Sequence, residues 1–325
     1  MDNPDYLSRR SALAGLTLGG AGLLALRPAP ARAARRGKPS LDLNNATDNC
    51  KALLKLQSDL SGKDTLSVFP GEVWAWVPGE SNTLLWKTLG LGASRVEWVE
   101  AERSYHFYHR EALLYLEPKS GEVLESWYNP WTQRRVEVIH ILNEHVNRYY
   151  QIDGGRFRFP WAYETNGDDL VFRISMFRCD ENVMSRKEYP LHAQSDKYQS
   201  SELWGMIGSL GEVQDPEVTS AACVTSWSRI SGWQPFMEMG NMPGQTVFHS
   251  HSHKLLNGLQ DLDKVMPRNV RIWFEKNQPK YFESPRTWTS PAESIGVWNY
   301  SKNLIDERRR AGLKAGQTPF SWPRA

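Results

Sequence analysis

The stretch ETNGDDLVFRISMFRC, Glu164–Cys179, decides the fold class of this chain. Asn166-Gly167 is a strong signal for a two-residue hairpin turn, because both residues tolerate the positive φ that such a turn requires. After the turn, apolar and polar side chains alternate from Leu170 to Cys179, as they do in a strand with one buried face. With a preceding strand at 156–164, the stretch predicts an antiparallel β-hairpin.

The same alternation recurs along most of the chain and predicts about ten to twelve strands. Pro70-Gly71 is predicted to turn a hairpin between strands at 65–69 and 73–77. Asn129-Pro130-Trp131-Thr132 has the same expected role between 123–128 and 135–142. Further strands are expected at 83–87, 94–99, 105–116, 202–210, 222–230 and 245–255. Helices are expected at 46–60 and after Pro267.

Many antiparallel strands in chain order, with few helices, predict a mainly β fold. We expect an antiparallel meander that closes into a calycin-like barrel with peripheral helices, and a β-sandwich fits the same pattern. Closure removes exposed strand edges, and beyond about eight strands the interior has room for a ligand. The barrel domain with its C-terminal helix is expected over 41–300, followed by a charged tail at 301–325.

The N-terminus has the pattern of an export signal. Arg9 and Arg10 form a twin-arginine pair, an apolar run follows to Leu26, and Ala31-Arg32-Ala33 has the small-x-small pattern of a cleavage site. The apolar run is too short for a stable membrane anchor. We therefore expect 1–33 to be a twin-arginine signal recognised by the twin-arginine translocase and cleaved after Ala33. A disordered lead-in is expected at 34–40, and the mature protein is expected to be periplasmic or secreted.

Composition excludes several classes of protein. The net charge is +2, and residues 1–33, with four arginines and two aspartates, account for it. Basic residues in the mature part are interspersed with acidic ones, so no nucleic-acid partner is expected. The motifs GxSxG, GxGxxG, GxxxxGK[ST] and HExxH do not occur. The three cysteines are compatible with one disulfide and a spare thiol, or with three buried thiols.

The chain has 14 tryptophans, well above ordinary usage. They fill a β core, or they line an interior that accepts a bulky apolar or aromatic ligand. Arg229 shares a strand face with Trp227 and is a candidate for an anionic or carbonyl group, with a buried ion pair as the alternative. The candidate ligand-binding residues are Trp76, Trp98, Trp127, Trp161, Trp204, Trp227 and Arg229.

A histidine run follows Phe248. In a strand at 245–255, alternation places His249, His251 and His253 on one face, next to Val247 and Leu255, which favours an inward orientation. Two imidazoles at i and i+2 lie about 7 Å apart, close enough to share a Zn, Fe or Cu ion with a third ligand from elsewhere. The alternatives are ordinary surface histidines and metal-free acid–base use. No cofactor beyond such a divalent metal is expected.

His140 is the second candidate for chemistry. It lies on a predicted apolar strand face, and Glu144 and His145 follow closely enough to orient it or share a proton. The alternative is a core histidine whose hydrogen bonds are satisfied. The predicted catalytic residues are His140, Glu144 and His145.

Four segments resemble an uncharacterised bacterial family of exported proteins, the domain of unknown function 1838 family. They are LDLNNATDNCKALLKLQSDLSGKD, YLEPKSGEVLESWYNPWTQRRVEVIHILNEHVN, SWSRISGWQPFMEMGNMPGQTVFH and VRIWFEKNQPKYFESP. The resemblance covers roughly 41–300 and implies a shared fold and twin-arginine export. It implies no settled activity or catalytic residue, and the histidine run at 249–253 is not part of its pattern.

Together these patterns predict an exported barrel that accepts a small apolar or aromatic molecule. The leading hypothesis is an enzyme of the lyase, isomerase or hydrolase type that uses histidine acid–base chemistry without an organic cofactor. A non-catalytic periplasmic carrier and a metal-binding protein are the alternatives.

Overall fold

The computed structural model describes residues 40–154, 157–291 and 296–312. The strands are β1 Thr65–Trp76, β2 Thr83–Val99, β3 Ser104–Leu116, β4 Ser126–Asn129, β5 Arg134–Glu137, β6 Ile141–Asn143, β7 Arg148–Gln151, β8 Tyr163–Asn166, β9 Asp169–Glu181, β10 Lys197–Ser209, β11 Val224–Ser231 and β12 Gln245–Leu255. The α-helices are α1 Ala46–Gln57, α2 Leu210–Gln214, α3 Leu259–Val265, α4 Arg268–Asn277 and α5 Val297–Arg310. Short 3-10 helices are η1 Glu100–Glu102, η2 Pro235–Met237 and η3 Pro279–Phe282.

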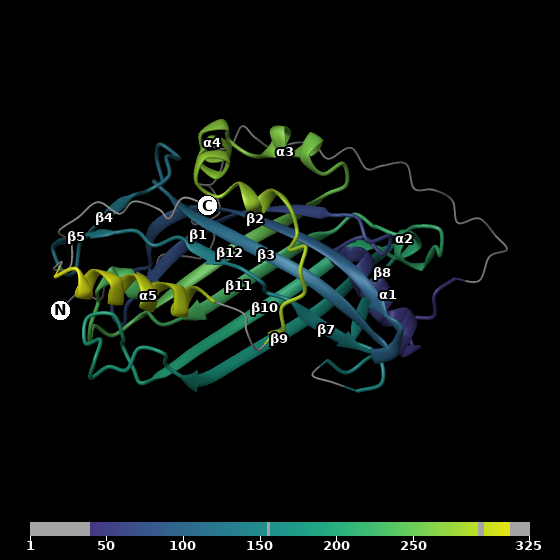
Figure 1. Cartoon of the computed structure of the whole chain (residues 1–325), viewed down its shortest axis with the longest axis horizontal. Helices are drawn as coiled ribbons and strands as arrows, with labels where there is room; N and C mark the ends of the chain where they lie inside the picture. Colours follow the sequence, from purple (N-terminus) through teal and green to yellow (C-terminus); the bar gives the residue numbers. More distant parts are fainter. Residues whose placement is uncertain (1–39, 155–156, 292–295, 313–325) are drawn as a thin grey trace, which may run out of the picture. The chain divides into compact units, whose positions relative to one another are not determined.

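Ten strands form one antiparallel sheet in the order β6-β3-β2-β1-β12-β11-β10-β9-β8, with β7 also paired to β3 (Figure 1). β4 and β5 form a separate hairpin. The chain is therefore mainly β, as predicted. One end of this order is formed by β6 and β7, and the other end is β8. Among the described residues, no hydrogen-bonded strand pairing joins the two ends into a closed barrel.

One face of the sheet, called the inner face here, carries two apolar clusters. The first lies under α1 and contains Phe107 of β3, Tyr150 of β7, Ile174 of β9 and Met206 of β10. These strands belong to opposite ends of the strand order, so the sheet bends until their inner side chains meet. The second cluster includes Trp86 and is closed by η2, α5 and the β4–β5 hairpin.

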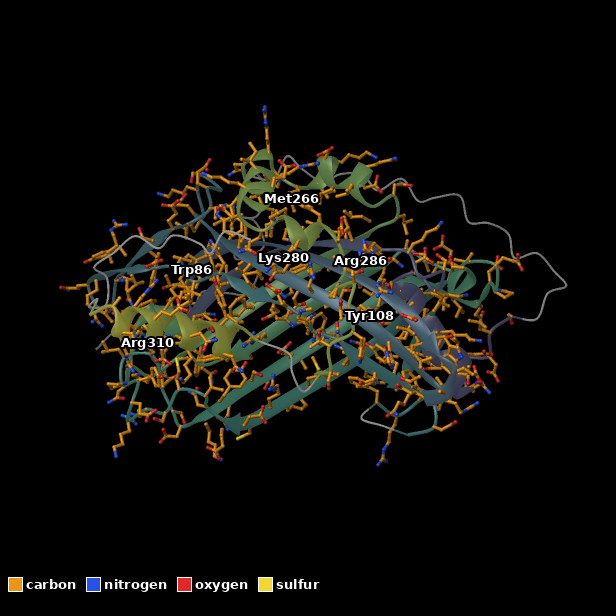
Figure 2. The ribbon with its side chains drawn as sticks, in the orientation of Figure 1. Trp86, Tyr108, Met266, Lys280, Arg286 and Arg310 are labelled. Carbon is orange, nitrogen blue, oxygen red and sulfur yellow. The ribbon has the colours of Figure 1, made fainter. Side chains whose placement is uncertain are left out.

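The opposite, outer face is covered over only part of its width. A third apolar cluster packs α3, α4 and η3 against the outer side chains of β1, β2 and β3, with Leu262 and Phe274 fully buried. Figure 1 shows α3 and α4 on this side, and Figure 2 marks Met266 in the same layer. The outer side chains of β9–β11 include exposed Phe177, Leu203 and Ile230. Burial therefore differs between the two halves of the outer face.

Most predicted elements are present, but the strands expected at 83–87 and 94–99 are the single strand β2, and the strand expected at 156–164 is the short β8, which begins at Tyr163. A two-residue hairpin turn is confirmed between β8 and β9, but its loop residues are Gly167 and Asp168, since Asn166 pairs with Asp169 and only Gly167 has a positive φ, +62°. The strand expected at 245–255 is β12, and the helix after Pro267 is α4.

The hairpin predicted at Pro70-Gly71 is wrong, because β1 runs unbroken from Thr65 to Trp76. Pro70 pairs with Leu89 of β2, and within the described residues it has no partner in β12. Proline has no N–H to donate, and the strand tolerates it because Pro70 lies at a break in the β1–β12 ladder, between the pairs Val68–His253 and Gly71–Ser250.

Several predictions concern parts of the chain outside the described residues. The twin-arginine signal at 1–33 and the lead-in at 34–39 are among them.

Part of the expected tail at 301–325 is instead the helix α5, which buries Leu304 and Ile305. Cys50, Cys179 and Cys223 are free thiols, and Cys179 is exposed. None of the described helices is long and apolar enough to cross a bilayer.

Gly90 tests the packing of the inner face. A Cβ at Gly90 would lie 1.7 Å from the ring of Phe69, whereas a Cβ at Gly205 of β10 meets no atom within 4 Å. We predict that Gly90→Ala lowers the free energy of unfolding by about 1–3 kcal/mol. Gly205→Ala, the matched control, should leave it unchanged or raise it by about 0.5 kcal/mol. Urea unfolding measures both, and equal values for the two variants would contradict the packing described.

Candidate functional site

The middle of the inner face, between the two apolar clusters, is charged. Residues at this level include His109 and Glu111 of β3, Arg148 of β7, Glu202 of β10 and Arg229 of β11. All five belong to strands whose other inner side chains form the apolar core. Ionised groups held out of bulk water must be paired or hydrogen-bonded, so each has an identifiable environment.

His109 and Glu111 form an imidazole–carboxylate pair. They are two residues apart on β3, and alternation therefore puts both side chains on the inner face. The His109 Nε2 to Glu111 Oε2 distance is 3.2 Å, and Asn143 donates to Glu111 Oε1 at 2.9 Å. Burial acts to raise the pKa of Glu111, but the bonds from His109 and Asn143 and the charge of Arg148 outweigh it and lower the pKa to about 2.

The state of Glu111 fixes the tautomer of His109. Because an ionised carboxylate only accepts hydrogen bonds, Nε2 of His109 carries the proton of this bond, and in the neutral ring Nδ1 is the nitrogen with the lone pair. Nδ1 is buried and has no hydrogen-bond partner among the described residues. The pair is therefore an oriented imidazole with one nitrogen free to accept a proton.

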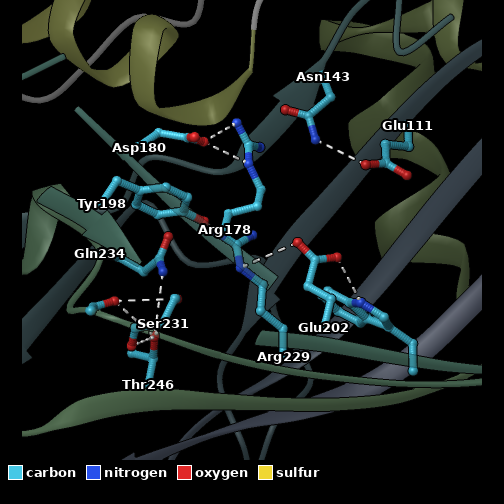
Figure 3. Close-up of polar contacts among 12 residues, drawn as sticks. Glu111, Asn143, Arg178, Asp180, Tyr198, Glu202, Arg229, Ser231, Gln234 and Thr246 are labelled. Carbon is cyan, nitrogen blue, oxygen red and sulfur yellow. Dashed lines mark hydrogen bonds and ion pairs between the residues drawn. The ribbon is translucent and has the colours of Figure 1, made fainter. Parts of the chain in front are cut away.

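A second polar group lies on β10 and β11. Glu202 accepts a hydrogen bond from the Trp227 indole at 3.1 Å and lies 4.0 Å from Nε of Arg229 (Figure 3). Arg229 also donates to the hydroxyl of Tyr198, and its guanidinium lies 5.8 Å from the centre of the Phe248 ring. Burial acts to lower the pKa of Arg229, but Tyr198 and Glu202 more than offset it.

Arg148 connects the two groups. Its partner in the β3–β7 ladder is Phe107, so its side chain lies on the inner face. Burial acts to lower the pKa of Arg148, but Tyr150, Glu111 and Glu202 raise it above the usual value. The pKa of Arg148 is therefore raised by carboxylates from both ends of the strand order, Glu111 of β3 and Glu202 of β10.

A pocket opens beside Arg148. Its apolar lining includes Tyr150, Phe157, Trp161, Ile174, Met176 and Trp204. Arg148 and Gln57 supply its polar lining. Its empty space, including the part open to solvent, is about 310 Å³. The cavity itself measures about 20 Å³, room for about one water molecule and far below the roughly 300–1,000 Å³ of ligand pockets, so a ligand here extends into the space open to solvent.

The structure brings together some of the predicted ligand-binding residues. Trp161 and Trp204 line the pocket, and Trp227 and Arg229 lie beside it around Glu202. Trp127 instead packs edge-on against Trp86 in the second apolar cluster, with ring centres 5.2 Å apart.

Trp76 and Trp98 are away from the pocket. Trp76 is 47% exposed at the end of β1, opposite Gln245 of β12, so the expectation that it faces inward is wrong. Trp98 pairs with Tyr105 of β3 near the end of β2 and lies at the rim, 37% exposed, in an open groove with Lys51 and Tyr105.

The predicted catalytic residues His140, Glu144 and His145 lie apart from the charged middle of the inner face. His140 is fully buried, and its Nδ1 accepts a hydrogen bond from the backbone N–H of Tyr115 at 3.1 Å. Burial lowers the pKa of His140 to about 3, and its ring packs edge-on against Trp273 of α4. This environment corresponds to the core histidine that the sequence left as the alternative.

The other two members of that group face the helical layer or the edge of the sheet. Glu144 forms an ion pair with Lys280 of η3, which Figure 2 marks below α4. His145 has a positive φ of 55°. The catalytic role of the three residues stays a prediction, and none of them lines the pocket.

The histidine run lies on the outer face, so its predicted inward orientation is wrong. His249 and His251 are exposed, and Phe248 and Ser250, which alternate with them along β12, are buried. His249 Nδ1 lies 2.9 Å from Ser228 Oγ, and the His249 and His251 rings are 4.8 Å apart. Within the described ranges, no three His, Cys, Asp or Glu side chains are grouped to hold a metal ion. A metal role for His249, His251 and His253 stays a prediction.

Sequence reasoning missed His109, Glu111, Arg148 and Glu202. The signal for the first two was available, because Tyr105, Phe107, His109, Glu111, Leu113 and Tyr115 alternate along a predicted strand. The signal was a charged pair in the centre of an otherwise apolar strand face. Arg148 and Glu202 had no comparable signal, since their meeting depends on the bend of the sheet.

The fold and site define a mainly β protein with a charged, aromatic-lined pocket on the inner face of one large antiparallel sheet. The model of the family described as "Protein of unknown function (DUF1838)" matches residues 62–305, and the chain belongs to this family. No curated protein matched the chain.

The buried state of His140 predicts how stability depends on pH. The pKa of His140 is lowered to about 3 from an unperturbed 6.5, so between these values the unfolded chain binds a proton that the folded chain does not. His140 therefore makes stability fall as the pH falls through this window, by about 1.4 kcal/mol per unit. We predict a shallower slope by that amount in His140→Asn, measured by urea unfolding between pH 6 and pH 4. Equal slopes of unfolding free energy against pH in the natural protein and in His140→Asn would contradict a buried, neutral His140.

Proposed function

We propose that this protein is an enzyme that binds a small apolar or aromatic molecule in the inner-face pocket and transfers a proton with His109. The observation that carries the proposal is the half-buried His109–Glu111 pair, in which one imidazole nitrogen is bonded to an ionised carboxylate and the other has no partner among the described residues. Its place in the charged cluster beside an aromatic-lined pocket links it to a ligand.

The chemistry follows from the roles of the two residues. Glu111 orients the ring and stabilises the imidazolium that forms when Nδ1 accepts a proton. Glu202 and the two arginines provide a fixed set of charges near developing charge on a substrate. Lyase, isomerase and hydrolase reactions that proceed by proton transfer to or from a side chain need no organic cofactor.

The proposal includes the architecture and the compartment. We place the pocket in a calycin-like barrel, and the meeting of inner side chains from β3 and β7 with those of β9 and β10 supports this arrangement over two separate sheets. Export by the twin-arginine translocase to the periplasm or beyond is part of the same proposal. It rests on the Arg9-Arg10 pair and the apolar run that follows.

A non-catalytic carrier is the second candidate. The aromatic lining of the pocket, with Trp161 and Trp204, supports ligand binding equally well without any reaction. The metal-binding alternative rests on the exposed His249 and His251 pair alone.

The test separates binding from chemistry. The full chain is screened by ligand-observed NMR against a panel of aromatic and terpenoid compounds. Each compound that binds is then incubated with the protein in D2O and analysed by mass spectrometry for deuterium uptake or conversion. We expect binding together with one of these mass changes. Binding without any mass change would overturn the enzyme proposal and favour the carrier.

The variants assign the proton transfer. We predict that His109→Gln and Glu111→Gln retain binding but lose roughly 10²–10⁴-fold in rate. The matched control is His106→Gln, because His106 also pairs with a carboxylate, Glu102 at 2.7 Å, but its ring stacks on Trp288 at the outer face of β3. An unchanged rate in His109→Gln, or an equal loss in His106→Gln, would clear His109 of the role.

A further inference from the structure

Arg148 differs from the other charged residues of the inner face in its partners. Glu111 accepts from His109 and Asn143, and Glu202 accepts from Trp227 and lies beside Arg229. Arg229, the sequence candidate for an anionic or carbonyl group, is thus already engaged, as in the buried ion pair that was the alternative. By contrast, Arg148 has no described carboxylate within 4.0 Å of its guanidinium, and Tyr150 is the hydrogen-bond partner that contributes to its pKa.

A guanidinium has five N–H donors, so one phenol oxygen leaves most of them available. Arg148 lines the pocket, and the available donors therefore border its empty space. Trp204 lines the same pocket, and its indole N–H is buried with no acceptor in the described part of the chain. A buried donor without an acceptor costs about 1–3 kcal/mol, which a ligand oxygen would recover.

The surroundings determine which anion fits. Glu111 and Glu202 both act on Arg148 through their charges, so a second negative charge on the ligand would be repelled. A carboxylate carries one charge, and its two oxygens match the parallel N–H groups of a guanidinium. The remaining lining, including Phe157, Trp161 and Met176, is apolar and suits a flat or aliphatic body.

We infer that Arg148 and the indole of Trp204 form a carboxylate subsite, and that the ligand is a small monocarboxylic acid with an aromatic or apolar body. The inference rests on the proposed pocket and specifies its ligand class. The carboxylate lies against Arg148, and the apolar body extends along Trp161 and Phe157. The acid is thereby held on the same inner face as His109.

The test uses pairs of compounds that differ only in the charged group. The probes are 3-phenylpropionate with 3-phenylpropan-1-ol, and indole-3-acetate with indole-3-ethanol, titrated into the full chain by calorimetry. We expect each acid to bind roughly 10–100-fold more tightly than its alcohol, as a hydrogen-bonded ion pair requires. Arg148→Gln should abolish this difference while leaving the alcohol affinity unchanged.

Two further variants serve as controls. Arg173→Gln removes an exposed arginine of β9 that pairs with Glu164 away from the pocket, and it should retain the full preference for acids. Trp204→Phe keeps an aromatic ring and removes only the N–H, so it should weaken acid binding and spare alcohol binding. It also tests the subsite if Arg148→Gln fails to fold.

The outcomes separate this inference from the proposed function. Equal affinity for acids and alcohols in the natural chain would overturn the carboxylate subsite and leave the pocket in place. An acid preference that survives Arg148→Gln and Trp204→Phe would also overturn it. Failure of all four probes to bind would overturn the subsite for these acids, and failure of the wider aromatic and terpenoid panel would overturn the pocket itself.

Discussion

The pairing of buried charge on the inner face is the constraint on which the rest of this structure depends. Two arginines and two glutamates lie between two apolar clusters, and each would be unfavourable there without the others. Glu202 is satisfied by neighbours on β11, whereas Arg148 on β7 requires the bend of the sheet to come within range of Glu202. The bend that completes the apolar core is thus the same bend that assembles the charged site.

The two faces of the sheet have different roles. On the outer face of β1–β3, the side chains of the strands bury apolar surface under α3, α4 and η3, which stabilises the fold without forming a pocket. On the inner face, apolar clusters at both ends leave a charged middle that is partly exposed. Glu111 retains 29% of its side-chain exposure and Glu202 retains 17%. Solvent therefore reaches both carboxylates, as a ligand site requires.

Alternation along the sequence predicted strands well, and it predicted poorly which face each strand would bury. The bounds of β12 follow directly from the pattern, yet His249 and His251 face outward, because the inner face of β12 buries Phe248 and Ser250 instead. The pattern of β3 was equally clear, and there the histidine and glutamate face the interior. Alternation has the same period for either orientation, and the choice depends on which strands the C-terminal helices cover.

Residues brought together from distant parts of the chain were beyond sequence reasoning. Arg148 lies in a four-residue strand with little periodicity, and Glu202 is one polar residue among several on β10. Trp161 and Trp204 were predicted from residue type alone and line the pocket, and Trp227 lies beside it against Trp204. Trp76 was selected for the same reason and lies on the outside, because residue type alone carries no information on facing.

A crystal structure of the protein purified from its native source, at a resolution that shows bound small molecules, tests the central claim most directly. The account predicts electron density for a small organic molecule in the inner-face pocket, with an oxygen within hydrogen-bond distance of Arg148. It would be contradicted by a pocket filled only by protein side chains, with Arg148 bonded directly to Glu111 or Glu202 and Trp204 packed against its neighbours without a gap.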